Sequence, residues 1–455
     1  MREIEFSADR LISALLAASE QSGVCFLDSC NVNYLGSHLL IAGINPIETS
    51  QITNNNPADT LRFLDEKLSQ KDSAYIFTIS YDFGLKLENI KPRKKEFPAF
   101  PEPDVFLARF GSLVVHDYDE RKTFLVGDEN KFDELQKLLA SYSINSINSI
   151  NSKITSNFSR ENYIAAVEKI KEFIRRGDTY QTNLTQQIRA KLPENLTAQE
   201  IFRRLRTNHS APFAAFIRRD ADAVVSISPE RFFKVENGKW KTENTEDKSC
   251  SFISASPIKG TRPRGKTSEE DERLRSELLE SEKDRAENVM IVDLLRNDIG
   301  RICKFGSVAV EKLCDLETHP TLFHLVSTVT GELRENVKFS DIIRAVFPCG
   351  SITGAPKIRT MQIIDQLETA PRGLSMGAIG YSFQGSKFKV QSSGTETYHY
   401  LDLSVAIRTM VVRGREAIFN VGGGIVIDSD AGEEYAETLT KARALLNALG
   451  VDVGN

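Results

Sequence analysis

Hydrophobic positions in the second half of the chain recur with helical spacing in several segments. The pattern predicts a helix from Ser159 to Arg176, which the serine can cap and Gly177 can end. Its apolar face would consist of Tyr163, Val167, Ile170 and Phe173. Thr197 with Glu200 three residues later is typical of a capping box, which predicts the start of a second helix.

Other segments are predicted to be helical or extended by the same reasoning. Residues 267–297 are charged and predicted helical, and a helix from about Glu433 to Leu449 ends the chain. Strands are expected at Phe213–Ile217, Val224–Ile227, Phe232–Val235, Leu403–Val412 and Glu416–Val421. Turns are expected at Asn237-Gly238 and Arg413-Gly414. Because the strands come in adjacent pairs with helices grouped between them, the sequence predicts an α+β fold with helices packed outside antiparallel sheet.

The first part of the chain, to about Leu139, contains short apolar runs such as Val24–Leu27 and Tyr75–Ile79, and no motif that indicates chemistry. Prolines and aromatic residues crowd the segment 90–104, which excludes a helix or a central strand there. Residues 143–151 repeat Ser-Ile-Asn and are typical of a loop or linker.

The amino-acid composition excludes some classes of protein but does not indicate a function. The chain has 455 residues, of which 40% are hydrophobic and 27% charged, as in ordinary globular proteins. A formal net charge of -5 gives no indication of nucleic acid or an anionic membrane as a partner. The chain has no apolar stretch long enough to span a bilayer and no signal pattern at its start. Six scattered cysteines without a Cys-x-x-Cys pair indicate reduced thiols in the cytoplasm, not zinc or disulfides.

Residues 350–357 form a glycine-rich turn that leads through a proline into a periodic run starting at Ile358. Such a turn presents free N–H groups and the positive end of a helix dipole, which suits a carboxylate or phosphate. The spacing is not that of a Walker A loop. An ordinary loop–helix junction explains this segment equally well.

Acidic residues on two predicted helices could bind a divalent cation. Glu434, Glu437 and Lys441 are spaced to share one helix face, and Glu287 lies on another helix. Carboxylates that leave room for waters and substrate suit Mg²⁺. The three glycines Gly422–Gly424 after a strand would allow close approach of a ligand. Surface charge and a simple turn are the alternatives.

Two further residues could act in catalysis. Lys259 lies between a proline and a glycine in Pro257–Thr261, and in its neutral form it could be a covalent nucleophile. Glu230, in Ser228–Phe232, could be a general acid if burial raises its pKa. For either residue alone, a solvated side chain is the simpler interpretation.

These motifs occur in a fixed order along the chain. Together with His324–Ser327, Gly380-Tyr381 and Ala406–Thr409, the order closely resembles the chorismate-utilising enzymes over about Phe158 to Leu449. That family includes anthranilate, aminodeoxychorismate, isochorismate and salicylate synthases. The resemblance implies an α+β fold with a large two-sheet antiparallel β-sandwich core, helices packed outside, and chorismate and Mg²⁺ in a cleft. It also implies a variable N-terminal region packing on the core (1–140), a linker (141–157) and a chorismate-binding catalytic region (158–449).

The resemblance assigns roles to single residues by motif. The catalytic residues are Lys259 and Glu230. The residues that resemble Mg²⁺ ligands are Glu287, Glu434 and Glu437. The residues that resemble those holding the substrate are Thr261, His324, Thr353, Gly354, Tyr381, Arg408, Gly423, Gly424 and Lys441.

Two positions distinguish the members of the family. Where isochorismate and salicylate synthases have a lysine that activates water, this chain has the neutral Gln181. The centre of the Pro-Ile-x-Gly-Thr run is alanine in anthranilate synthases, and lysine in many aminodeoxychorismate synthases, as at Lys259. The resemblance therefore implies amination of chorismate at C4, through a covalent Lys259 adduct, for para-aminobenzoate and folate synthesis. Anthranilate synthesis and a non-catalytic chorismate-binding homologue are the alternatives.

The source of ammonia is expected to lie outside this chain. The sequence has no Gly-x-Cys-x-Gly segment with a following His-x-Glu, which is the glutaminase signature. We therefore expect a separate glutamine amidotransferase subunit as partner. The sequence departs from the family in a longer stretch at about 242–254 and in a second insertion at about 385–401, both expected at hairpin tips.

Overall fold

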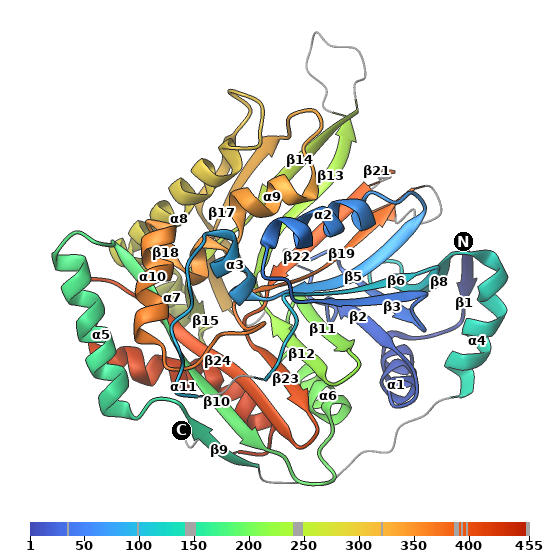
Figure 1. Ribbon diagram of the computed structural model, residues 1–455, viewed down its shortest axis with the longest axis horizontal. Coiled ribbons are helices and arrows are strands. Elements are labelled where there is room, and N and C mark those ends of the chain that lie inside the picture. The colour runs from blue at the N-terminus through green and yellow to red at the C-terminus, as the bar shows by residue number, and fades with distance from the viewer. Residues whose placement is uncertain are drawn as a thin grey trace.

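The computed structural model describes residues 1–33, 36–97, 100–141, 152–239, 249–319, 322–385, 391–392, 395–396 and 399–451. Two large antiparallel sheets face each other at its centre, and helices lie on their outer sides (Figure 1). The predicted α+β class with an antiparallel two-sheet core is confirmed.

Within the described residues, the larger sheet has twelve strands. Their order is β1 (Arg2–Ile4), β8 (Lys122–Gly127), β7 (Ser112–Asp117), β3 (Leu39–Ile44), β2 (Val24–Asp28), β11 (Phe213–Arg218), β12 (Ala223–Ser228), β23 (Thr409–Arg413), β24 (Glu416–Ile425), β10 (Gln181–Lys191) and β18 (Gly354–Ala355). The short strand β9 (Lys153–Ser156) pairs with the far end of β10.

The smaller sheet has ten strands in the part of the chain that the structure describes. Their order is β15 (Ile258–Pro263), β17 (Leu322–Glu332), β14 (Ser249–Ala255), β13 (Arg231–Lys239), β22 (His399–Val405), β19 (Ala378–Gln384), β5 (Ser73–Ile79), β6 (Val105–Phe110) and β4 (Glu48–Ile52), with β16 (Ala309–Thr318) on β17. The strands β20 (Gln391–Ser392) and β21 (Thr395–Glu396) form a separate pair.

Strands from the first 140 residues belong to both sheets. In the larger sheet β2 pairs with β11, and in the smaller sheet β5 pairs with β19. Between the sheets, Ile76 and Phe106 from the N-terminal part pack with Ile217 and Val224 in one apolar cluster. The expected division near residue 140 therefore does not divide the sheets, and part of the expected linker forms β9.

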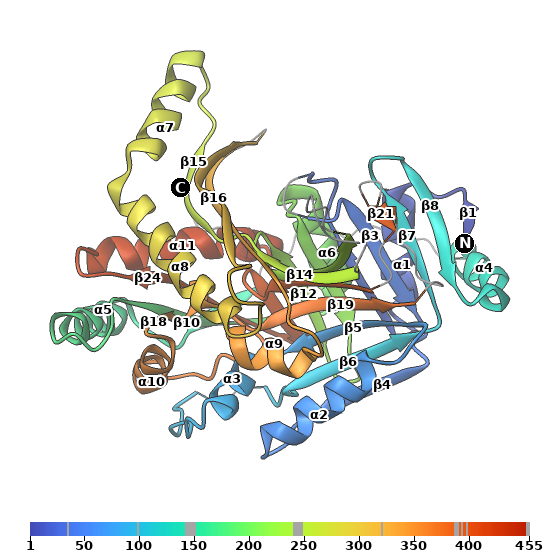
Figure 2. The same ribbon diagram turned by 90° about the horizontal axis from the view of Figure 1, so that it is seen from above.

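Helices cover both outer faces, so the molecule is layered as helices, sheet, sheet and helices (Figure 2). The larger sheet is covered by α1 (Ala8–Ala18), α4 (Phe132–Ser141), α6 (Ala198–Asn208) and α11 (Ala431–Ala448). The smaller sheet is covered by α2 (Pro57–Leu68), α3 (Tyr81–Leu87), α8 (Glu282–Gly300), α9 (Phe339–Val346) and α10 (Lys357–Leu367). Helix α5 (Arg160–Arg175) packs with α11 beside β10, and α7 (Ser268–Glu280) packs on β17.

The helix signals in the sequence are mostly confirmed. Ser159 Oγ accepts the N–H of Asn162 at 3.2 Å, and Gly177 has φ +77° just after α5. Thr197 Oγ1 likewise accepts the N–H of Glu200 at 3.3 Å. The carboxylate of Glu200 binds arginines of its own helix instead of the Thr197 backbone, so only half of that capping box forms.

Three predicted elements differ from the structure. The segment 267–297 is two helices, because Ser281 ends α7 and caps α8 with its hydroxyl. Asn237-Gly238 is not a turn, since both residues continue β13 and pair with Ser251 and Cys250 of β14. The run 403–412 is not one strand: β22 belongs to the smaller sheet and β23 to the larger, and Arg408 between them has φ +47°.

The remaining expectations concern loops. No helix or strand lies in the described parts of residues 90–104, as the prolines predict. The centres of the two expected insertions, 240–248 and 386–390, lie outside the described residues, as does most of the Ser-Ile-Asn repeat. Among the described helices, none combines the length and the apolar character that a membrane crossing needs.

Candidate active site

Lys259 lies on β15, near three carboxylates from different elements. It is half-buried, and its charge opposes the effect of burial, which acts to raise the pKa of Glu230, Glu287 and Glu437. The next residue, Gly260, has φ +83°, and a Cβ there would be 2.9 Å from Leu278. Glycine is therefore required after Lys259 both for the backbone conformation and for the close approach of α7.

Glu230 lies at the start of β13 and is 8% exposed. Its backbone is fixed by the Ser228 hydroxyl, which accepts its N–H at 3.3 Å, and by Val405, whose N–H donates to its carbonyl at 3.1 Å. Burial raises the pKa of the Glu230 carboxyl, while the charge of Lys259 and a hydrogen bond with Ser351 act in the opposite direction. A buried carboxyl with a raised pKa can stay protonated near neutral pH and act as a general acid.

Two carboxylates of α11 face the backbone of β24 at Gly423. A Cβ on Gly423 would lie 3.0 Å from Glu434 Oε2 and 3.8 Å from Glu437 Oε1. It would also lie 3.7 Å from Lys441 Nζ, which donates to the Gly422 carbonyl at 3.1 Å. The glycines lie within the strand and not after it, and their lack of side chains leaves room for these groups.

The carboxylates differ in their surroundings. Burial raises the pKa of Glu287 on α8, and it raises that of Glu434, to which the Ser429 hydroxyl donates at 2.6 Å. Burial also acts on Glu437, but Lys441, 2.6 Å away, holds its pKa below the usual value. A cation bound among these groups would relieve the cost of burying negative charge on Glu287 and Glu434.

The donor set fits an open magnesium site. Among the described residues, no three His, Cys, Asp or Glu side chains already form a closed metal-binding group. Magnesium is usually bound by one or two protein carboxylates and completes its shell with waters and substrate oxygens. Such an open set of carboxylates is present here. Glu434 and Glu437 lie beside Gly423, and Glu287 lies within electrostatic range of Glu437.

Thr261 and His324 face each other across β15 and β17. Thr261 Oγ1 and His324 Nδ1 are 2.8 Å apart. Burial, with the positive charges of His319 and Arg408, lowers the pKa of His324 to about 4. The ring is therefore neutral at physiological pH. Arg408 is exposed and lies within electrostatic range of His324.

The glycine-rich turn meets the start of β10. Gly354 pairs with Thr182, and the N–H of Asn183 donates to the Thr353 carbonyl at 2.7 Å. Gln181 is fully buried, and neither of its amide atoms has a hydrogen-bond partner among the described residues. A Cβ on Gly424 would be only 2.2 Å from Gln181 Nε2, so this amide points at the glycine strand.

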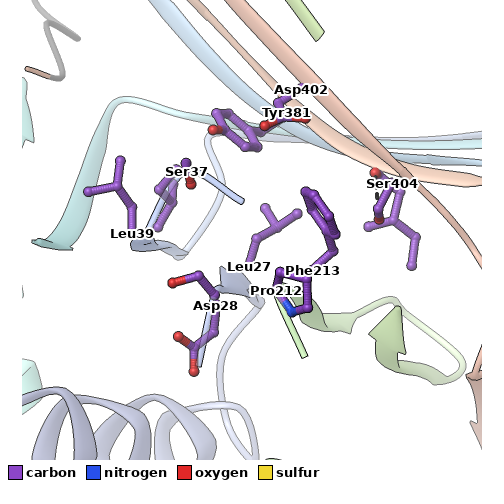
Figure 3. A pocket seen from close by; sticks show the side chains of 12 residues that line it. Leu27, Asp28, Ser37, Leu39, Pro212, Phe213, Tyr381, Asp402 and Ser404 are labelled. Atoms are coloured by element: carbon purple, nitrogen blue, oxygen red, sulfur yellow. Dashed lines mark hydrogen bonds between the residues drawn. The ribbon is translucent and has the colours of Figure 1, made fainter. Parts of the chain in front are cut away.

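Tyr381 does not lie with the other predicted residues. It is on β19, buried between the two sheets, and lines a cavity with Asp28, Pro212 and Asp402 (Figure 3). The cavity holds no other residue of the predicted substrate set. Its expected role in holding a substrate carboxylate stays a prediction, which this cavity does not support. Strand alternation turns this side chain toward the larger sheet, which a motif match alone does not reveal.

Sequence reasoning missed two residues of the site. Lys283 acts on the pKa of Glu287, Glu434 and Glu437. It precedes Glu287 by one helical turn on α8, so helical spacing could have indicated it. Ser351, which hydrogen-bonds Glu230, lies inside the glycine-rich turn, but no pattern distinguished it from its neighbours.

Known proteins resemble this chain in sequence and structure. Anthranilate synthase component 1 of Aquifex aeolicus is 41% identical over 65% of this chain and 54% of that protein, so the match spans about half of its length. Aminodeoxychorismate synthase component 1 of Bacillus subtilis is 35% identical over 82% of this chain and 76% of that protein. The crystal structure of anthranilate synthase component I from Streptococcus pneumoniae superposes with a TM-score of 0.74, covers 90% of this chain and 92% of that one, and is 28% identical.

Residues 23–447 match the family described as chorismate binding enzyme. This range includes every residue of the site described above, and it includes strands of both sheets. The chain therefore belongs to the chorismate binding enzymes.

Proposed function

We propose that this chain is an aminodeoxychorismate synthase component 1, which adds ammonia at C4 of chorismate to give 4-amino-4-deoxychorismate. The product is the precursor of para-aminobenzoate and folate. The observation that carries the proposal is the position of Lys259, within electrostatic range of the buried acid Glu230 and of the carboxylates of α8 and α11. The relative in Bacillus subtilis is an aminodeoxychorismate synthase component 1, which supports this assignment.

Magnesium would be held by Glu287 and Glu434, with Glu437 in the same shell. When bound, the ion supplies charge neutralisation and orientation to a substrate carboxylate. Arg408 and Lys441 provide the protein's own positive charge for the carboxylates of chorismate, and fixing both would orient the ring. The missing side chains of Gly423 and Gly424 leave room for Glu434, Lys441 and Gln181, the groups that would surround a bound substrate.

Lys259 and Glu230 carry the bond changes. The neutral amine of Lys259 attacks C2, both ring double bonds shift by one position, and the 4-hydroxyl leaves as water with the proton of Glu230. Ammonia then adds at C4, both double bonds shift back, and the C2–N bond breaks to release the neutral Lys259 amine. A proton of the added ammonia returns to the Glu230 carboxylate. The raised pKa of Glu230 suits a group that must hold a proton before the first step.

Gln181 supports ammonia over water as the nucleophile. Its side chain is neutral, so it cannot take a proton from water as a lysine could. Its buried amide next to Gly424 can still donate and accept hydrogen bonds with a bound molecule. This residue therefore favours an incoming nucleophile that needs no strong base.

We propose that a glutamine amidotransferase subunit supplies the ammonia, because the sequence lacks the glutaminase signature. We also place the reaction in the cytoplasm. Within the described residues, the six cysteines form no disulfide, which fits a reducing compartment.

Anthranilate synthesis is the second candidate, favoured by the 41% identity to the Aquifex aeolicus protein. The deciding experiment incubates the chain with chorismate, ammonium and Mg²⁺, and separates the products by chromatography with fluorescence detection. We expect 4-amino-4-deoxychorismate and no fluorescent anthranilate. Anthranilate with release of pyruvate would contradict the proposal, as would no turnover at any magnesium concentration.

A further inference from the structure

The edge of β10 that faces away from β24 has a gap between its neighbouring strands. In the described part of the sheet, β18 pairs with residues 181–182 of this edge and β9 with residues 188–191. Between them no strand is paired with the edge, although backbone groups there point outward and must find partners. The N–H of Asn183 donates to the Thr353 carbonyl, as described above.

A buried ion pair fills the part of the gap beside Asn183 and Thr185. Arg372 and Glu368 have side chains only 1% and 3% exposed. Two guanidinium N–H groups donate to the two carboxylate oxygens at 2.9 and 2.8 Å. Arg372 Nη2 also donates to the Asn183 carbonyl at 2.9 Å, and Glu368 Oε1 accepts the Thr185 N–H at 2.8 Å.

Arg372 thus donates a hydrogen bond to Asn183, and Glu368 accepts one from Thr185, two residues further along the same strand edge. A neighbouring antiparallel strand would do the same with its own backbone. The side chains of Arg372 and Glu368 therefore replace a strand at this point, and they fix the position of β10 where no strand does.

The same guanidinium reaches the glycine-rich turn. Arg372 Nη1 donates to the Ile352 carbonyl at 2.9 Å. Ile352 lies between Ser351, which hydrogen-bonds Glu230, and Thr353, which binds Asn183. One side chain therefore connects the partner of the proposed general acid with the strand that carries Gln181.

Stability alone does not explain such a pair. A buried ion pair is often no more stabilising than apolar residues of similar volume, because removing two charges from water is costly. Here the planar guanidinium of Arg372 donates hydrogen bonds to three partners, Glu368, Asn183 and Ile352. It also lies over the Tyr81 ring, with its central carbon 4.5 Å from the ring centre. A lysine could not hold these partners at once.

We propose that Arg372 is a positioning residue of the active site: clamped by Glu368, it closes the gap in the edge of β10 and holds the turn that carries Ser351 in register with that strand. The inference rests on the proposed function, since it assigns Arg372 an effect on the Glu230 step. Arg372 itself does not touch the reacting atoms.

The test compares Arg372→Lys with Arg206→Lys, which alters another shielded arginine pair, with Asp28, on the far side of the larger sheet. Hydrogen exchange should accelerate at residues 181–183 and 350–354 in Arg372→Lys only. The kcat for chorismate and ammonium should fall at least about tenfold in that variant, because small displacements of catalytic groups reduce rates strongly. Arg206→Lys should keep the wild-type kcat.

The pH dependence of kcat separates positioning from general destabilisation. Glu230 must be protonated, so kcat falls as the pH rises through its pKa, and the hydrogen bond from Ser351 lowers that pKa. Arg372→Lys loosens the turn, so it should weaken this hydrogen bond and move the alkaline limb of the kcat–pH profile to higher pH. Ser351→Ala should have the same effect. The double variant should show no additional movement. Lys259, Lys441 and Cys349 also interact with Glu230, and none of these variants changes them.

If Arg372→Lys does not fold, Glu368→Gln serves instead, since it removes the charge and keeps an acceptor for Thr185. Wild-type exchange at both segments, a wild-type alkaline limb, or additive shifts in the double variant would each overturn the inference. Absence of turnover in the wild-type protein would instead reject the proposed function. The exchange comparison needs no turnover, so the two failures are distinguishable.

Discussion

At the scale of single residues, the site brings together several carboxylates, whose mutual repulsion is reduced by lysines that lie between them. Lysines alternate with carboxylates, as in the Lys441–Glu437 pair at 2.6 Å and the approach of Lys259 to Glu230 and Glu287. Such surroundings shift pKa values at sites of catalysis. Two predictions belong at this scale.

Lys259 should form a covalent adduct when ammonia is withheld. Intact mass spectrometry of wild-type protein with chorismate and Mg²⁺ should show an added chorismate-derived mass, because expulsion of the lysine needs ammonia. Lys259→Ala should show none, while Lys266→Ala, which alters an exposed lysine nearby, should keep the adduct. An adduct that persists in Lys259→Ala would exclude the covalent role.

Gly423→Ala should weaken magnesium dependence. The added methyl group would lie 3.0 Å from Glu434 Oε2, so this carboxylate would have to move. We expect the magnesium concentration for half-maximal turnover to rise by about tenfold, as for other changes that reorient metal ligands. Gly300→Ala, where a Cβ would meet nothing within 4 Å, is the matched control. An unchanged magnesium titration would argue against Glu434 as a ligand.

At the scale of elements, the site depends on where helices begin and where strands change sheets. Helix α11 carries Glu434, Glu437 and Lys441, and its N-terminus is fixed by Asp430, which accepts the N–H groups of Gly432 and Glu433, both at 2.9 Å. The cap therefore sets both the start of the helix and the direction of its first carboxylates.

Asp430→Ala should reduce the stability of this helix by about 1 kcal/mol, the usual effect of losing an N-cap side chain. The melting temperature and the affinity for magnesium should fall together, because the helix start carries Glu434. Asp430→Asn keeps the capping oxygen and should resemble wild type in both measurements. Equal losses in the Ala and Asn variants would show that charge, not capping, is the important property.

At the scale of the whole molecule, the N-terminal residues complete the sheets that carry the site. β2 pairs with β11 of the larger sheet, and β5 pairs with β19 of the smaller sheet. Removing them would expose two long strand edges and the apolar layer between the sheets.

A fragment of residues 152–455 should therefore aggregate or lack turnover. Coexpression with residues 1–141 should restore part of the soluble protein, because the missing strands can pair again. Size-exclusion chromatography and chorismate turnover would measure both. A soluble, active 152–455 fragment would instead establish the N-terminal region as a separate domain.

Local sequence signals were sufficient to predict most of the helices, several strands and the family. Helix α5 begins and ends where Ser159 and Gly177 predict, because caps and 3.6-residue periodicity are local properties. The strands β23 and β24 pair across a turn at Gly414-Arg415, one residue from the expected position, for the same reason. The order of motifs indicated the family, which the match over residues 23–447 confirms.

Features that depend on contacts between distant segments could not be predicted from local patterns. An apolar run such as 403–412 indicates that its residues are buried, but it does not indicate in which sheet they lie. The sequence therefore could not predict that the chain passes from the smaller to the larger sheet at Arg408. Tyr381 faces the cavity between the sheets because of its strand register, not its motif. The hydrogen bonds of Arg372 connect β10, Glu368 at the end of α10, and the glycine-rich turn. No local sequence pattern predicts that a side chain will take the place of a neighbouring strand.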